Sequence, residues 1–167
     1  APVFTLENYD GNDISLADFK GKIVVLEWFN YDCPFTKYHY ETKDTMVNLA
    51  EKYRDQGVVW LAINSTKYAT PEENKKFANK HDVPFAILDN SSGSVGKSYD
   101  AERTPHMFII NKEGTIVYEG AIDNAPPKKE VENYVNYVDQ ALSELVEGKK
   151  VSTDQTEPYG CTVKYKN

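Results

Sequence analysis

Two apolar runs of strand length, residues 23–29 (IVVLEWF) and 58–63 (VVWLAI), lie on either side of a segment with helical character. Both runs are rich in β-branched and aromatic residues, which is typical of strands buried on both faces of a sheet. Residues 34 to about 52 carry apolar side chains at intervals of three or four, and the proline at their start suits a first helical turn. The pattern predicts a strand–helix–strand unit with a parallel pair of strands.

The rest of the chain extends this unit on both sides. A short hairpin turning at residues 10–13 and a helical turn capped by Ser15 come first, and a helix over 70–81 with Thr70 as its N-cap follows the second strand. Further elements are predicted as a strand at 85–88, a helical turn at 94–99, an antiparallel pair at 107–110 and 115–120, a last helix from about 128 to 147, and an added edge strand at 162–165.

This order predicts an α/β fold with a central mixed sheet flanked by helices, which is the thioredoxin-like plan. We expect one domain over residues 1–167, with an N-terminal hairpin and with 148–167 as a C-terminal tail. The 26 acidic and 19 basic residues give a net charge of -7, which argues against nucleic acid or an anionic membrane as a partner. No apolar run approaches the roughly 18 residues of a membrane span.

The chain has only two cysteines, Cys33 and Cys161, which excludes a disulfide-dense scaffold and a four-cysteine zinc site. They are either unrelated thiols or one redox pair. Cys33 lies between a strand and a helix, where free amide groups and the helix dipole stabilise a thiolate. Lys37, on the same helix face, would lower the pKa of Cys33 further, whereas Asp32 would oppose it. The alternative is a buried, inert cysteine.

Glu27 interrupts the first apolar strand six residues before Cys33. Burying an unpaired carboxylate is costly, so we expect either a raised pKa or a partner. A carboxyl group in that state could accept or donate the proton of the thiol, directly or through water. The alternative is an ion pair at an exposed strand end.

Thr104-Pro105 precedes a strand and is a candidate cis peptide bond. The histidines raise the question of a metal site that includes Cys33. His39 lies about 240° around the helix from Cys33, His81 ends the second helix, and only His106 has a route to the thiol. One cysteine and one histidine supply few ligands for a metal ion, so we expect no metal and no cofactor.

Four ordered motifs carry a resemblance that covers nearly all of the chain: WFNYDCPFTKYHY, TPHMFII, GAID at residues 120–123, and PYGCTVKY. They resemble the redoxin (AhpC/TSA) branch of the thioredoxin-like superfamily, and more closely the bacterial peroxiredoxin-like thioredoxin family proteins. The resemblance implies that Cys33 is the nucleophile and Glu27 the buried acid. It also implies that Thr104 and Pro105 form the cis-proline loop that pairs with substrate backbone, and we assign Pro34 and Thr36 to substrate binding with them.

Three positions depart from the patterns of related branches. Thr36 stands where thioredoxins have their second cysteine, so a disulfide within that motif cannot form. Leu26 and Asn30 occupy the places of the proline and the peroxide-binding threonine of true peroxiredoxins. Lys37 stands where copper-delivery relatives have their second cysteine.

Cys161 is therefore the only partner within the chain for Cys33. The 13 residues at 148–160 could extend to roughly 43 Å, well beyond the ~15 Å radius of gyration of such a domain. If Cys161 lies beside Cys33, the two can act as resolving and attacking thiols. If it lies elsewhere, it is a structural or free thiol.

The expected function is thiol-disulfide exchange, with a weak thiol peroxidase or a non-catalytic protein- or copper-binding module as alternatives. The expected partners are a protein or small-molecule disulfide or peroxide and a thiol electron donor, without nucleic acid, and the chain is a monomer or homodimer. The resemblance, together with the absence of an initiator Met, predicts a periplasmic or secreted protein of the bacterial cell envelope.

Overall fold

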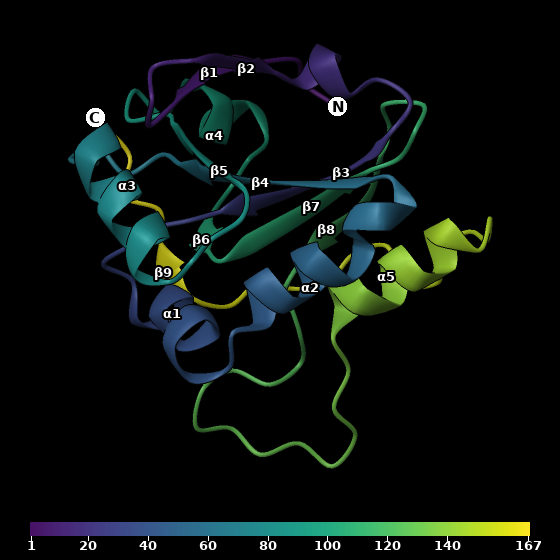
Figure 1. Cartoon of the computed structure of the whole chain (residues 1–167). Coiled ribbons are helices and arrows are strands. Elements are labelled where there is room, and N and C mark those ends of the chain that lie inside the picture. Colours follow the sequence, from purple (N-terminus) through teal and green to yellow (C-terminus); the bar gives the residue numbers. More distant parts are fainter.

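The computed structural model describes residues 1–167, and its centre is a seven-stranded mixed sheet (Figure 1). The strands are β1 (Thr5–Asn8), β2 (Asp13–Ser15), β3 (Ile23–Trp28), β4 (Val58–Asn64), β5 (Ala86–Asp89), β7 (His106–Ile110) and β8 (Ile116–Gly120). They lie in the order β2-β1-β5-β4-β3-β7-β8. Strands β3, β4 and β5 are parallel, and the flanking pairs are antiparallel. The predicted mixed sheet with its parallel centre is confirmed.

Each face of the sheet carries its own apolar core because nearly every residue of the central strands is buried. The larger core lies under α2 (Thr45–Tyr53), α3 (Pro71–Lys80) and α5 (Tyr137–Val146). The smaller core lies under the N-terminal hairpin and α4 (Ser94–Ser98). Two 3-10 turns, η1 (Leu16–Phe19) and η3 (Arg54–Gln56), complete the connections. Ser15 and Asp18 form the predicted capping interaction of η1.

The helix predicted over residues 34–52 is wrong as a continuous element. It is divided into α1 (Pro34–Lys37), a π-helical turn η2 (Tyr38–Thr42) and α2. Asp44 has a φ of 50°, in the left-handed region, which no regular helix can continue through. The break leaves residues 33–42 as a separate short element at the end of β3, with His39 and Tyr40 buried.

The last helix is also shorter than predicted, since α5 begins at Tyr137 rather than near residue 128. Pro126 and Pro127 supply no backbone N–H groups, and Lys128 has a φ of 68°. The segment instead folds back on itself through Asn124, whose side chain accepts a hydrogen bond from the backbone of Val135 at 3.0 Å. Residues 121–136 therefore form an irregular excursion, visible at the bottom of Figure 1.

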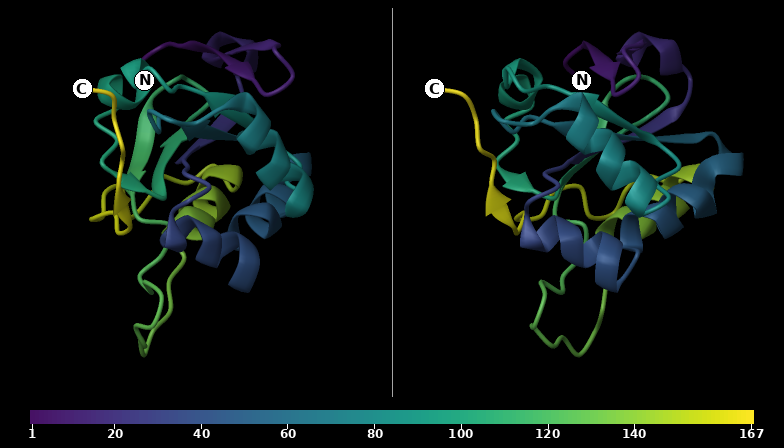
Figure 2. Two further views of the ribbon diagram at one scale, coloured as in Figure 1. Left: turned by 90° about the vertical axis from the view of Figure 1, so that its left-hand side faces the viewer. Right: turned by 60° about the vertical axis from the view of Figure 1, so that its left-hand side comes forward.

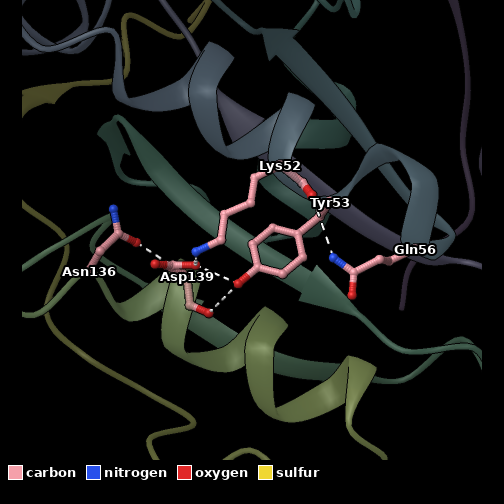
Figure 3. Close-up of polar contacts among 5 residues, drawn as sticks. All are labelled: Lys52, Tyr53, Gln56, Asn136 and Asp139. Carbon is pink, nitrogen blue, oxygen red and sulfur yellow. Dashed lines mark hydrogen bonds and ion pairs between the residues drawn. The ribbon is translucent and has the colours of Figure 1, made fainter.

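Polar contacts fix α5 against α2 (Figure 3). The hydroxyl group of Tyr53 donates to the carboxylate of Asp139, and Lys52 forms an ion pair of 2.9 Å with the same carboxylate. The side chain of Asn136 accepts from the backbone N–H of Asp139 at 2.8 Å and caps the helix. These contacts bind two of the three helices that cover the larger core.

The C-terminal tail does not extend the main sheet, so the predicted edge strand at 162–165 is wrong in place and length. The tail first runs beside β8, where Thr156 N–H donates to the carbonyl of Glu119 at 3.1 Å. Its strand β9 (Cys161–Thr162) then pairs antiparallel with β6 (Arg103–Thr104) in a separate two-stranded ladder. Figure 2 shows the tail passing α1 before it follows the side of the molecule. None of the helices is long and apolar enough to cross a bilayer.

Candidate dithiol site

Cys33 lies where β3 has ended and α1 begins, and it is the N-cap residue of α1. Its side chain is buried, and its Sγ donates a hydrogen bond of 3.2 Å to the carbonyl oxygen of Thr104. The peptide bond between Thr104 and Pro105 is cis, as the sequence predicted. The chain therefore brings the cis-proline loop against the thiol at the helix start.

Cys161 lies opposite Thr104 in the ladder of β6 and β9, and its thiol is close enough to that of Cys33 for each thiol to shift the pKa of the other. Both cysteines are in the free thiol form. Gly160 makes this approach possible, because a Cβ atom there would lie 2.1 Å from the carbonyl oxygen of Thr104. Of the two placements left open for Cys161, the structure has the one beside Cys33.

The two thiols have different environments. Burial alone would raise the pKa of Cys33, but hydrogen bonds from Cys161, from the Thr104 side chain and from the backbone N–H of Thr36 outweigh it, so its pKa is lowered. Burial and the adjacent Cys33 raise the pKa of Cys161 to about 11. Cys33 is thus the more readily ionised of the two thiols.

Two threonine hydroxyls lie buried near the thiols without a hydrogen-bond partner, those of Thr36 and Thr104. The Thr104 hydroxyl is close enough to the Cys33 sulfur to lower the pKa of that thiol. Pro34 occupies the first turn of α1 and is exposed. Lys37 lines a polar cavity of about 210 Å³ with Asp32, and its effect on the pKa of Cys33 stays a prediction.

Glu27 is completely buried on β3, on the face of the larger core. Its carboxylate accepts hydrogen bonds of 2.8 Å from the hydroxyl of Tyr40 and 3.0 Å from Nε1 of Trp60. Burial raises its pKa to about 7 despite these two donors. Both expected features are present, a raised pKa and polar partners, and the alternative of an exposed ion pair is wrong.

The hydrogen bonds of His39 and His106 go to groups other than the two thiols. Nδ1 of His106 accepts from the backbone N–H of Glu102 at 3.1 Å, and its ring packs on Phe108. His39 is completely buried and bonds to Thr45 and Tyr159. No three side chains of His, Cys, Asp or Glu come together as metal ligands would.

Sequence reasoning missed the polar residues that fix the tail. Asp123 is buried and accepts a hydrogen bond of 2.6 Å from the hydroxyl of Tyr159, which itself contacts His39. These three residues fall in the motifs GAID, PYGCTVKY and WFNYDCPFTKYHY. The motifs therefore contained these residues. Asp123 and Tyr159 lie 84 and 120 residues after His39, however, and the spacing of the motifs does not show that the three are in contact.

A mixed sheet, a thiol at a helix start and a facing cis-proline define a protein of the thioredoxin-like fold class. A thioredoxin-like protein from Aeropyrum pernix superposes with a TM-score of 0.59 at 25% identity, over 71% of this chain and 80% of that one. The sequence model of the AhpC/TSA family matches residues 1–119. The chain belongs to the AhpC/TSA family.

Individual relatives fall in two groups. The chain is 29% identical over 138 residues to thiol-disulfide oxidoreductase ResA of Bacillus thuringiensis subsp. konkukian, covering 83% of this chain and 76% of the relative. It is 30% identical over 128 residues to chloroplastic peroxiredoxin Q of Triticum aestivum, covering 70% and 55%. An uncharacterized conserved protein from Geobacillus kaustophilus superposes over 99% of this chain and 90% of its own, with a TM-score of 0.91 and 34% identity.

Proposed function

We propose that the protein is a thiol-disulfide oxidoreductase in which Cys33 attacks and Cys161 resolves. The observation that carries this proposal is the contact between the two thiols, one with a lowered and the other with a raised pKa. A dithiol with one ionised member is the arrangement that exchanges with a disulfide. The similarity to ResA, a thiol-disulfide oxidoreductase by name, supports the same chemistry.

The reaction proceeds in two exchanges. The Cys33 thiolate attacks one sulfur of a substrate disulfide, forms a mixed disulfide, and releases the other substrate sulfur as a thiolate that takes up a proton. Cys161 then loses its proton and attacks the Cys33 sulfur, which releases the second substrate thiol. Two electrons pass to the substrate, and a Cys33–Cys161 disulfide remains. An external thiol donor returns the protein to its reduced form.

The neighbouring residues have distinct parts in this proposal. The Thr104 hydroxyl and the backbone N–H of Thr36 stabilise the attacking thiolate. We assign Glu27, with a pKa near 7, to the proton of the Cys33 thiol, which it can accept or donate directly or through water. We also assign substrate binding to Pro34, which is exposed, and to Thr36, Thr104 and Pro105, which are buried while β9 is paired.

Replacement of each cysteine tests the proposal. Cys33→Ser should lower the rate of reduction of a disulfide reporter by at least about a hundredfold, because no thiolate remains to attack. Cys161→Ser should keep the attack and accumulate the mixed disulfide at Cys33, which mass spectrometry detects. Full activity of Cys33→Ser would refute the proposal.

A thiol peroxidase is the second candidate, favoured by the similarity to peroxiredoxin Q. There, Cys33 would attack hydrogen peroxide, become a sulfenic acid and release water, and Cys161 would condense with it to form the same disulfide and a second water. Rate constants for peroxide and for a disulfide, measured on one preparation, separate the two functions. A peroxide reaction no faster than that of free cysteine excludes the second.

We place the protein in the bacterial cell envelope as part of this proposal. Disulfides persist outside the reducing cytoplasm, so a disulfide substrate is available there. Protein disulfides are the substrate class that we infer. Detection of the native protein in periplasmic or secreted fractions tests the location.

A further inference from the structure

A chain of hydrogen bonds joins three segments that are far apart in the sequence. Asp123, in the loop after β8, accepts from the hydroxyl of Tyr159 at 2.6 Å. That hydroxyl lies 2.8 Å from Nε2 of His39 in η2, and Nδ1 of His39 lies 2.9 Å from Oγ1 of Thr45 at the start of α2. We refer to Thr45, His39, Tyr159 and Asp123 as the anchor network.

The direction of each hydrogen bond follows from the carboxylate at one end. An ionised carboxylate only accepts, so the Tyr159 hydroxyl donates its single proton to Asp123 and accepts from His39. Nε2 of His39 then carries the proton, and Nδ1 accepts from the hydroxyl of Thr45. Burial lowers the pKa of His39 to about 4, so the ring is neutral near pH 7 as this pattern requires. Every member therefore has a defined role as donor or acceptor.

The anchor network holds the part of the tail that carries Cys161. Tyr159 precedes Cys161 by two residues, and its ring packs against Phe35 of α1 with 6.0 Å between the ring centroids. The backbone N–H of Phe35 in turn lies close enough to the Cys161 thiol to offset part of the rise in its pKa. His39 and Asp123 are 0% and 1% exposed, so their hydrogen bonds are protected from competing water. The contacts of Tyr159 thus fix the tail immediately before the second thiol.

Resting on the proposed function, we propose that His39, Tyr159 and Asp123 are positioning residues that hold Cys161 within reach of the Cys33 sulfur during the second exchange. None of their hydrogen bonds involves a sulfur atom, so they act on the reaction by holding the tail in place. Their loss should slow resolution of the mixed disulfide much more than it changes the attack by Cys33. A residue that served only overall stability would not separate the two steps.

The reagent 5,5′-dithiobis(2-nitrobenzoate) resolves both steps on the full chain. One coloured thiolate is released when Cys33 attacks, and the second is released when Cys161 resolves the mixed disulfide. Tyr159→Phe keeps the ring but removes a hydroxyl that makes hydrogen bonds to two buried side chains, so the second release should be about tenfold slower. The first release should change by no more than about threefold, since Thr104 and the backbone N–H of Thr36 still stabilise the Cys33 thiolate.

Tyr134→Phe is the matched control. The Tyr134 hydroxyl donates to the other carboxylate oxygen of Asp123 at 2.8 Å, but Tyr134 lies in the loop before α5 and not in the tail. Both releases should stay within about twofold in this variant, because one hydrogen bond of a half-exposed side chain is lost. Equal rates for wild type and Tyr159→Phe, or equal slowing in both variants, would overturn the proposal.

Hydrogen exchange gives a readout that does not depend on the chemistry. The backbone N–H of Val163 donates to the carbonyl of Glu102 at 3.0 Å and reports whether β9 is docked. Tyr159→Phe should accelerate its exchange, and Tyr134→Phe should not; unchanged exchange in Tyr159→Phe contradicts anchoring. If Cys33→Ser reacts like wild type, the proposed function fails, and the exchange of Val163 still decides whether Tyr159 holds the tail.

Discussion

Cys161 lies directly opposite Thr104, whose carbonyl oxygen also accepts the hydrogen bond of the Cys33 thiol. One residue of the cis-proline loop therefore fixes both sulfurs. Because β9 already pairs with β6 at this point, a protein substrate that pairs with the backbone of Thr104 has to replace β9.

Thr104→Val should raise the pKa of Cys33, because it removes a hydroxyl that donates to the thiolate. Alkylation of Cys33 below its pKa should slow by roughly three- to tenfold, the value of one hydrogen bond. The measurement is a pH profile of iodoacetamide modification, resolved by site with mass spectrometry. Thr36→Val is the control, because Thr36 acts on Cys33 through its backbone N–H. The same profile for both variants would contradict the assignment.

Gly160→Ala should displace β9. Its Cβ atom would lie 2.1 Å from the Thr104 carbonyl oxygen, and its φ of 138° is unfavourable for alanine. Formation of the Cys33–Cys161 disulfide under a fixed glutathione ratio should fall at least about tenfold as the docked tail is lost. Gly148→Ala also has a positive φ but meets open space, so its disulfide should form as in wild type. Equal behaviour of the two variants would show that β9 tolerates the clash.

Glu27→Gln should change how stability depends on pH. The pKa of Glu27 is about 7 in the folded protein against a usual value of 4.5, so the folded state binds more protons between these values. The free energy of unfolding therefore falls as pH rises from 4.5 to 7, by roughly 3 kcal/mol for this one group. Glutamine lacks this titration.

Urea unfolding of both proteins at pH 4.5 and pH 8 provides the measurement. Subtracting one protein from the other removes the contribution of all other groups. Glu27→Gln should gain stability relative to wild type at the higher pH. A difference that is constant across this range would mean that Glu27 has an ordinary pKa.

Tyr53→Phe should weaken the contact between α2 and α5 without affecting the dithiol. It removes the hydroxyl that donates to Asp139 and should cost about 1 kcal/mol of unfolding free energy. Lys52→Ala removes an ion pair whose lysine is 55% exposed, and it should cost less than about 0.5 kcal/mol. Urea titrations compare the free energies of unfolding of the two variants. A larger loss for Lys52→Ala would show that the ion pair, and not the Tyr53 hydrogen bond, is the stronger of the contacts in Figure 3.

Local patterns predicted the sheet because its strands are short, apolar and bounded by turns. The continuous helix over residues 34–52 was wrong because one left-handed residue, Asp44, interrupts an otherwise helical periodicity. The last helix was predicted too long because the apolar spacing begins at residue 131, whereas the backbone is irregular up to residue 136 and Lys128 is in the left-handed region. Apolar periodicity records which residues are buried, and it does not record where a backbone turns.

The residues of the candidate site also differ in whether the local sequence could reveal them. Cys33 and Glu27 could be found because each residue is unusual at its position. Cys33 is a thiol at the start of a helix, and Glu27 is an acid within an apolar strand. The place of Cys161 depends on Gly160 and on a hydrogen bond between Tyr159 and Asp123, which are contacts between distant segments. Such contacts leave no periodic signal in a single sequence.

The course of the tail beside β8 has a consequence for behaviour in solution. Strand β8 is the last strand of the main sheet on its side, and an open strand edge pairs readily with another chain. Residues 154–156 bond to the backbone of Glu119 and occupy part of that edge. The segment that brings a second thiol to Cys33 therefore also protects the protein from edge-to-edge aggregation.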